Sequence, residues 1–269
     1  MGASDEPPTM TEAEIRAELE RLAPFHHAVA LPFGLTAPVP TDERGPTDRL
    51  GEVTDQVWPA LLVEFGGSLD GLRVLDLASN AGGFSIEAAK SGAAYVLGVD
   101  IVEHYVEQAT FLARALGLDG VEFRHMRVQD LDPGEVGQFD VVLCLGLLYH
   151  LDDPVGVMRR VSSLTRRALV VDTNLIPPAE AKRGAPLWLM RVRRPYDDGK
   201  AATVGRWVGD NVIEFAPSNK AVVRLLHAIG FPDVRRMEPV GRGAVPRYVS
   251  NRRAVYLATR PTDTEGTAA

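Results

Sequence analysis

Short apolar runs alternate with periodic segments along the middle of the chain, beginning near residue 72. The apolar runs predict strands buried on both faces, at 73–77, 95–100, 121–123, 139–145 and 168–172. Between them, apolar residues recur every three or four positions, which predicts helices at 83–91, 103–116 and 154–164. With closing strands at 232–240 and 251–259, this order predicts an α/β fold, a doubly wound Rossmann-like sandwich with a mostly parallel seven-stranded sheet.

The residues before this alternation predict helices and a loop. Thr11 and Glu14 have the spacing of a capping box, so an amphipathic helix is expected to begin there. Prolines and glycines are dense over 31–47, which predicts a loop or lid that leads to a second helix near 53–66.

The later part of the chain interrupts the alternation. Residues 174–216 are rich in proline, arginine and tryptophan, and we expect them to form an insertion over the strand ends. A helix from 218 to 229 follows. We therefore expect three parts, which are an N-terminal tail with helices and lid loop over 1–66, a main domain over 67–260, and a disordered tail over 261–269.

Composition and charge narrow the class of protein. Hydrophobic residues make up 45% and charged residues 24% of the chain, as in ordinary globular proteins. No apolar stretch reaches the roughly 18 to 20 residues that span a bilayer, so we expect a soluble, cytoplasmic protein without a membrane partner. The net charge of −7 disfavours nucleic acid as a partner, because such binding needs a broad cationic surface. The single cysteine, Cys144, lies in an apolar run and is expected to be an inert core residue.

The first strand-to-helix turn is the best candidate for a cofactor site. The predicted strand at 73–77 runs into a turn of small residues, Ala78 to Gly82, and then into a helix. Ligands of such sheets bind beyond the carboxyl ends of the strands. A phosphate-binding loop would need a Lys-Ser/Thr ending, and a dinucleotide fingerprint would need three glycines in G-x-G-x-x-G. Both are absent, so the turn indicates a different cofactor.

This turn resembles the first motif of class I S-adenosylmethionine-dependent methyltransferases, in which an acid is followed by glycines at alternate positions. Asp76 stands at the acid, Ala78 and Asn80 stand where the first two glycines are usual, and Gly82 keeps the third. Alanine is the mildest replacement, and asparagine tolerates positive φ better than most residues, so the turn is feasible. A plain surface turn is the alternative.

Two further landmarks follow at the spacing of that family. Asp100 ends the second strand, and it either accepts the ribose hydroxyls or caps the helix that begins near Glu103. Gln129 and Asp130 resemble the third motif, which implies that Asp130 accepts the adenine amino group; a solvated loop acid is the alternative. The resemblance implies S-adenosylmethionine as cofactor, with contacts from Asp76, Ala78, Ser79, Asn80, Gly82, Phe84, Asp100, Ile101, Gln129, Asp130 and Leu145.

A later pattern resembles one branch of this superfamily. Gly146 to His150 precede Asp153-Pro154, and Asn211 to Ser218 follow later in the chain. This arrangement is similar to the branch that includes the bacterial tRNA wobble-uridine carboxymethyltransferase and many small-molecule relatives. The tRNA substrate is not carried over, because the chain is acidic and lacks the long basic N-terminal portion expected of that enzyme.

Methyl transfer from a sulfonium requires alignment of a nucleophile and removal of its proton. His150 is the candidate base, because a histidine pKa near 6.5 suits proton removal at neutral pH; a structural histidine is the alternative. Tyr149 is expected to contact the methionine portion or to orient the substrate. Magnesium at Asp152, Asp153 or Asp172 would lower the pKa of a substrate hydroxyl, although acids before a helix also serve as caps.

The acceptor is expected to be a small polar, anionic metabolite such as a sugar derivative or a natural-product intermediate, with O-methylation favoured. Arginines would grip an anion, aromatic residues would give the pocket its shape, and Asn and Glu would bind hydroxyls. The candidate substrate residues are Trp207, Asn211, Glu214, Arg191, Arg193 and His26. RNA methylation and an inactive cofactor-binding module are the alternatives, and a homo-oligomer is allowed.

Overall fold

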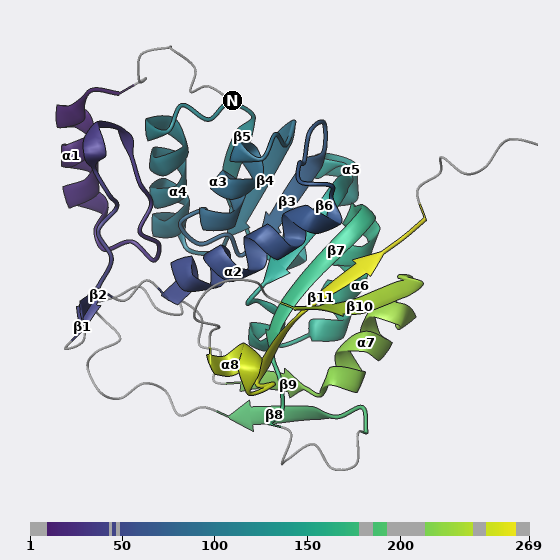
Figure 1. Ribbon diagram of the computed structural model, residues 1–269. Helices are drawn as coiled ribbons and strands as arrows, with labels where there is room; N and C mark the ends of the chain where they lie inside the picture. The colour runs from purple at the N-terminus through teal and green to yellow at the C-terminus, as the bar shows by residue number, and fades with distance from the viewer. Residues whose placement is uncertain are drawn as a thin grey trace, which may run out of the picture.

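A seven-stranded sheet crosses the molecule in the order β10-β11-β7-β6-β3-β4-β5 (Figure 1). The computed structural model describes residues 10–42, 45–46, 49–177, 185–192, 213–238 and 246–261. The strands of the sheet are β3 (Arg73–Leu77), β4 (Tyr95–Asp100), β5 (Val121–His125), β6 (Phe139–Leu145), β7 (Thr165–Asn174), β10 (Asp233–Met237) and β11 (Arg253–Thr259). The five strands from β3 to β7 are parallel to one another, whereas β11 runs antiparallel to both β7 and β10. The predicted Rossmann-like architecture is confirmed.

The strand order reverses at β3. This strand pairs with β4 on one side and with β6 on the other, and all three run in the same direction. The connections that leave β3 and β6 therefore diverge to opposite faces of the sheet. In open parallel sheets this reversal leaves a crevice at the carboxyl ends of the two strands, and ligands bind there. The geometry thus directs attention to the residues that follow β3, β4 and β6.

Helices cover both faces of the sheet. On one face, α6 (Pro154–Leu164) and α7 (Asn219–Ala228) pack against alternate strand residues such as Leu75 and Val142. On the other face, α2 (Arg49–Glu64) and α3 (Gly83–Lys90) pack against their neighbours Val74 and Val141. Alternate residues of a strand point to opposite faces, so strands that are apolar throughout need a helix layer on each side.

The centre of the sheet is fully enclosed. Cys144, in β6, is 0% exposed and belongs to the same apolar cluster as α6. Burial raises the pKa of its thiol to about 12, so the side chain is a neutral thiol at physiological pH. This agrees with the expectation of an inert core cysteine.

The N-terminal helix α1 (Glu12–Leu22) packs against α4 (Glu103–Ala115). Its capping box is present, because the Thr11 Oγ1 accepts from the Glu14 amide at 3.4 Å and the Glu14 carboxylate accepts from the Thr11 amide at 2.7 Å. Apolar residues on one side of α1 are buried against Phe111 and Leu112 of α4. The helix is therefore attached to the main sheet assembly through α4.

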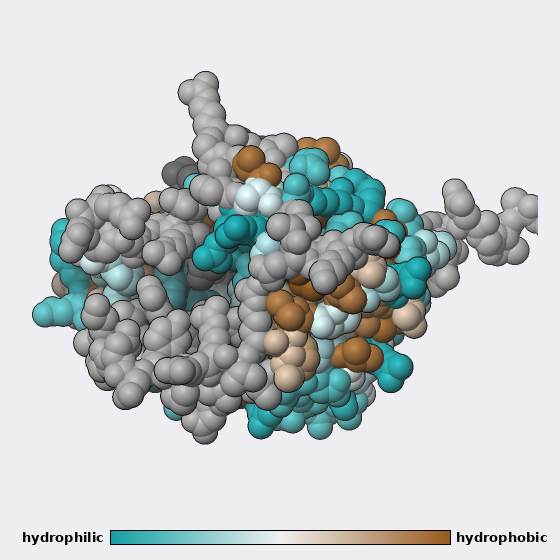
Figure 2. Space-filling view, turned by 90° about the horizontal axis from the view of Figure 1, so that it is seen from below, coloured by the Kyte–Doolittle hydropathy of each residue, from teal (hydrophilic) through white to brown (hydrophobic). Residues whose placement is uncertain are grey.

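The insertion contains regular structure that the sequence did not predict. β8 (Trp188–Val192) pairs antiparallel with β9 (Ile213–Pro217), and β9 contacts η3 (Leu148–His150) after β6. Figure 2 views the molecule from this side and shows hydrophobic residues gathered there. The exposed apolar residues of this region include Leu187, Leu189 and Met190.

Other boundaries shift by a few residues. Helix α2 begins at Arg49 rather than near 53, β5 extends to His125, and β7 extends over Thr165–Asn174. Within 31–47 the described part holds a short 3-10 turn, η1 (Pro32–Gly34), and two two-residue strands, β1 (Thr41–Asp42) and β2 (Gly45–Pro46). The remaining short elements are η2 (Val128–Asp130), α5 (Pro133–Val136) and α8 (Pro246–Val249). None of the helices in the described ranges combines the length and the apolar character that crossing a bilayer requires.

Candidate active site

The turn after β3 has a left-handed backbone at three alternate positions. The φ angles are +55° at Ala78, +52° at Asn80 and +80° at Gly82. Asn80 stabilises its own conformation, because its side-chain oxygen accepts the Ala81 amide at 2.7 Å. The turn therefore keeps the conformation expected of a glycine-rich loop although two of its glycines are replaced.

Glycine is required at the third position for a second reason. A Cβ built on Gly82 would lie 2.8 Å from the Phe123 ring and 3.0 Å from the Ala109 Cβ. Phe123 also lies 2.5 Å from the position of a Cβ on Gly98 in β4. The Phe123 ring thus fills the space beside both glycines, and close packing together with positive φ fixes the residue type at Gly82.

Asp76 lies beneath this turn and is almost completely buried, with 2% of its surface exposed. Its carboxylate accepts a hydrogen bond from the Ser85 hydroxyl of α3 at 2.7 Å. Burial raises the pKa of Asp76 to about 7, since one neutral hydroxyl compensates only in part for the loss of water. The buried carboxyl is therefore poised to ionise when a positive charge comes near it.

Asp100 at the end of β4 supports the turn from the neighbouring strand. One carboxylate oxygen accepts the Asn80 amide and the other accepts the Val102 amide, both at 2.9 Å. Burial raises its pKa, while these two amides partly oppose that shift. The second contact closes an Asx turn on the amide of Val102, which is the N-cap residue of α4, and it is not a helix cap, because α4 has no side-chain cap hydrogen bond. A carboxylate offers about four acceptor sites, and backbone amides of Val102, Asn80 and Ile101 use three of them, so capacity for a contact with ribose remains.

The residues predicted for the adenine lie beyond the next strand ends. Ile101 follows β4 and is 46% exposed, which is unusual for a large apolar side chain. Gln129 is half-buried and Asp130 is exposed, and both lie in η2 after β5. Since β4 and β5 are parallel neighbours, these three residues lie at one edge of the sheet. Their contact with a nucleobase stays a prediction.

Phe84 belongs to the apolar core beside the turn. It is 8% exposed, and its ring packs against Trp58 of α2 with ring centroids 6.2 Å apart. Core packing therefore accounts for this side chain, and its predicted contact with the cofactor stays a prediction.

The end of β6 presents the two candidate catalytic residues. Leu145 is half-buried, and Gly146 turns the chain with φ of +81° into η3, which holds Tyr149 and His150. The two rings lie against each other, with centroids 4.0 Å apart and planes inclined by 55°. Both side chains are half-buried beside the crevice between β3 and β6.

A buried ion pair lies next to this turn and was not predicted. Arg253 of β11 donates to both carboxylate oxygens of Asp172 in β7, and the Tyr248 hydroxyl donates to the same carboxylate at 3.0 Å. Asp172 is 0% exposed. Burial opposes the charge on Arg253, but the carboxylate outweighs it and raises the pKa of the guanidinium. The partners are 81 residues apart, and no local pattern signals their contact.

This ion pair and a helix cap occupy two of the three carboxylates named for magnesium. The Asp172 carboxylate is occupied by Arg253 and Tyr248, and Asp153 caps α6 by accepting the Gly156 amide at 2.8 Å. Across the described residues, no group of three or more His, Cys, Asp or Glu side chains is arranged to hold a metal ion. The capping alternative therefore accounts for Asp153.

The predicted substrate residues are only partly placed. Arg191 in β8 is the register partner of Glu214 in β9, so the two positions lie opposite each other across the small sheet. Trp188 of the same strand is half-buried and packs against the apolar core. Trp207, Asn211 and Arg193 lie outside the described residues.

His26 and His27 face different parts of the molecule. The His26 Nε2 lies 3.0 Å from the Tyr105 hydroxyl of α4. His27 is 5% exposed, and its ring lies directly over Gly83, the first residue of α3. Of this histidine pair, His27 is the residue whose ring reaches the turn after β3, and the predicted substrate contact of His26 stays a prediction.

Comparison with known proteins agrees with this geometry. A family model described as a methyltransferase domain matches residues 68–177. The ubiquinone biosynthesis O-methyltransferase of Neisseria meningitidis serogroup C is 35% identical over 98 residues, which are 36% of this chain and 41% of that protein. The protein of the same name from Bordetella avium is 37% identical over 106 residues, 38% of this chain and 42% of that protein. The match thus spans less than half of each curated relative, and neither belongs to the tRNA-modifying branch by name.

Solved structures share the fold over a longer part of the chain. The N-terminal domain of EvdMO1, crystallised in the presence of S-adenosylhomocysteine (SAH) and D-fucose, has a TM-score of 0.69 at 20% identity and covers 95% of this chain and 100% of that one. Magnesium protoporphyrin IX methyltransferase (ChlM) from Synechocystis PCC 6803 with bound S-adenosylmethionine has a TM-score of 0.52 at 20% identity. The match covers 78% of this chain and 79% of that chain. A methyltransferase-domain model thus matches residues 68–177, and the chain shares its fold with proteins crystallised with S-adenosylmethionine or SAH.

Proposed function

We propose that this protein transfers a methyl group from S-adenosylmethionine to an oxygen atom of a small polar acceptor. One observation carries the proposal. The turn after β3 keeps positive φ at Ala78, Asn80 and Gly82 and lies between two buried carboxyl groups, those of Asp76 and Asp100. Small residues in this conformation let a ligand approach the backbone at the point where the strand order reverses.

The residues of the crevice fit such a donor. Asp76 is a buried acid with one neutral partner, so a ligand ammonium near it would supply the missing counter-charge. Asp100 retains acceptor capacity for ribose hydroxyls. The buried Ser79 Oγ has no hydrogen-bond partner among the described residues. Buried polar groups are usually hydrogen-bonded, so a bound ligand would supply the missing partner. Ile101, Gln129, Asp130 and Leu145 would border the adenosine from the neighbouring strand ends.

S-adenosylmethionine, when bound, supplies an electrophilic methyl group on a sulfonium. The chain then has to hold the acceptor oxygen in line and receive its proton. His150 is assigned the role of base, because it follows β6 at the crevice and an imidazole accepts protons near neutral pH. Tyr149, whose ring lies against that of His150, is assigned to orient the acceptor or the base.

The acceptor is proposed as a small polar molecule, such as a sugar derivative or natural-product intermediate. O-methylation is supported by the names of the curated relatives. A polar acceptor is supported by the charged positions Arg191 and Glu214, which are paired in the two-stranded sheet beside η3. EvdMO1 shares only the fold with this chain. Because its N-terminal domain was crystallised in the presence of D-fucose, hydroxylated sugars are the first acceptors to assay.

The test combines donor binding with turnover. Calorimetric titration with SAH should give saturable binding, and incubation with S-adenosylmethionine and a panel of sugars, phenols and hydroxy acids should give a methylated product by mass spectrometry. H150A should lower kcat by about a hundredfold to ten-thousandfold while SAH affinity stays within about twofold of the unmodified protein. A protein that does not bind SAH would overturn the proposal, and binding without turnover of any acceptor would favour the inactive binding module.

A further inference from the structure

His27 is the residue of the N-terminal segment that reaches the cofactor turn. A Cβ built on Gly83 would lie 2.7, 2.8 and 2.9 Å from the Cε1, Nδ1 and Nε2 atoms of His27. These nearly equal distances mean that the face of the imidazole, over its Nδ1–Cε1–Nε2 side, lies against Gly83. Gly83 follows Gly82 directly, and Gly82 is the N-cap of α3. The ring therefore covers the start of this helix at the end of the turn.

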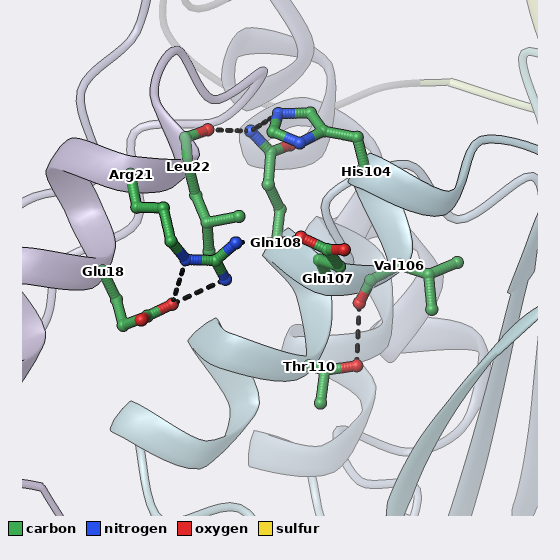
Figure 3. Close-up of polar contacts among 8 residues, drawn as sticks. All are labelled: Glu18, Arg21, Leu22, His104, Val106, Glu107, Gln108 and Thr110. Carbon is green, nitrogen blue, oxygen red and sulfur yellow. Dashed lines mark hydrogen bonds and ion pairs between the residues drawn. The ribbon is translucent and has the colours of Figure 1, made fainter.

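The position of His27 is set by contacts between the N-terminal segment and α4. Gln108 of α4 is completely buried, and its side-chain amide donates to the carbonyl oxygens of Leu22 at 2.6 Å and Pro24 at 2.9 Å. Figure 3 shows the Leu22 carbonyl facing this amide, with His104 beside it. Both amide hydrogens of Gln108 are used, so the last residue of α1 and the chain that leaves it are held by one side chain.

The next two residues continue this attachment. Phe25 is 1% exposed and packs against Phe111 of α4, with ring centroids 6.2 Å apart. His26 meets Tyr105 edge to face, with a 3.0 Å contact between its Nε2 and the hydroxyl. These ring contacts hold the side chains of both residues against α4, so the backbone up to His26 has a fixed position. His27, the following residue, is thereby held over Gly83.

The strand order indicates which end of the donor would meet His27. The sheet runs β6-β3-β4-β5, and the proposed contacts are adenine after β5, ribose at Asp100 after β4, and the transferred methyl near His150 after β6. The end of β3 lies between the ribose and the methyl positions. The amino-acid end of the donor is therefore expected at the β3 turn and the start of α3, where backbone amides favour a carboxylate.

We propose that His27 binds the amino-acid carboxylate of the methyl donor, and that Gln108 is a positioning residue that places His27 for this contact. The inference rests on the proposed function and deepens it, because it makes the N-terminal segment a part of the donor site. An imidazole N–H donates to a carboxylate in either the neutral or the protonated state, so the contact does not depend on a particular charge of the ring. Gln108 acts through the backbone of residues 22–24 and does not touch the donor.

Two ligands separate this contact from the rest of the site. SAH carries the amino-acid end, whereas 5′-methylthioadenosine has the same adenosine and thioether without it. H27F keeps a ring over Gly83 but removes the N–H donor. It should weaken SAH binding by about tenfold to a hundredfold, the effect of losing a hydrogen bond to a charged group. Its affinity for 5′-methylthioadenosine should stay within about twofold of the unmodified protein, as measured by calorimetric titration of both ligands.

Three further variants complete the experiment. H27Q restores a donor and should recover part of the SAH affinity. Q108L should show the same selective loss in smaller measure. T110V is the matched control, because Thr110 lies on the exposed side of α4 and its hydroxyl donates to the Val106 carbonyl of the same helix at 2.7 Å. T110V should bind both ligands normally.

The outcomes distinguish this inference from the function on which it rests. SAH affinity unchanged in H27F, or an equal loss for both ligands in a folded H27F protein, would overturn the role of His27 and leave the donor site standing. If the unmodified protein binds neither ligand, the proposed function fails, and the inference fails with it.

Discussion

The carboxyl ends of β3 and β7 each hold a buried aspartate, and the two are neutralised in different ways. Asp172 of β7 receives Arg253 and Tyr248, so its charge is balanced within the fold. Asp76 of β3 receives hydrogen bonds from the hydroxyl and the backbone of Ser85, both neutral donors, and burial raises its pKa to about 7. The end of β7 is thus closed by an internal cation, whereas in the part of the chain that the structure describes no cation is paired with Asp76 at the end of β3. A buried carboxyl without a counter-charge marks the place where a cationic ligand is bound most favourably.

Removing the charge of Asp172 tests the ion pair at the end of β7, and it should change the stability of the protein more than the other substitutions below. D172N leaves the Arg253 guanidinium buried without a counter-charge, which should lower the free energy of unfolding by about 3–5 kcal/mol in urea titrations. The double variant D172L/R253M removes both charges and should be considerably more stable than D172N. A D172N protein with the stability of the unmodified chain would show that the ion pair is not the element that closes this end.

Removing the charge of Asp76 tests the raised pKa at the end of β3 through the pH dependence of the protein's stability. A carboxyl whose folded pKa lies near 7 and whose unfolded pKa lies near 4 takes up a proton on folding between these values. Its contribution to stability is fully present below about pH 4 and is lost as pH rises through about 7, by up to about 4 kcal/mol. D76N should therefore match the unmodified protein at low pH and exceed its stability near pH 8.

Urea titrations at about pH 5 and pH 8 measure this difference. Adding SAH should reduce the advantage of D76N at pH 8, because its ammonium stabilises the ionised Asp76 in the unmodified protein. A difference between the two proteins that is the same at both pH values would contradict the raised pKa.

The backbone of the turn offers the smallest effect. Ala78 has a φ of +55°, a conformation that costs a side chain with Cβ about 1–2 kcal/mol. A78G removes this cost, but glycine also raises the conformational entropy of the unfolded chain, which disfavours folding. The net stabilisation should therefore be about 1 kcal/mol or less. A81G is the control. Ala81 is fully buried and does not have a positive φ, so its replacement by glycine should lower the stability of the protein. Thermal unfolding of both variants tests whether the turn is strained at Ala78.

The donor side of the site could be predicted from the sequence because it depends on neighbouring residues. Ala78, Asn80 and Gly82 lie in one turn, and the tolerance of each residue type for positive φ is a local property. The strand pattern around Asp76 and Asp100 is equally local, since apolar runs and their ends can be located without knowledge of the contacts.

The remaining features depend on contacts between distant segments. Arg253 meets Asp172 across 81 positions, and β8 pairs with β9 across a segment rich in proline and arginine that shows no strand alternation. His26 and His27 are adjacent, so only the contacts of the segment with α4 decide which of them turns toward Gly83. The sequence indicated a histidine near the site, but the backbone direction that selects His27 is a tertiary property.

Cys144 gives the protein an intrinsic reporter of its own opening. It is the single thiol of the chain, it lies in a central strand with no exposed surface, and it is neutral at physiological pH. An alkylating reagent can reach it only when the helix layer on its face of the sheet, which includes α6, moves away, so the labelling rate measures how often this part of the core opens. Because ligands of this fold bind at the edge of that same strand, a donor that slows the labelling would reveal its occupancy without a substrate and without a dye.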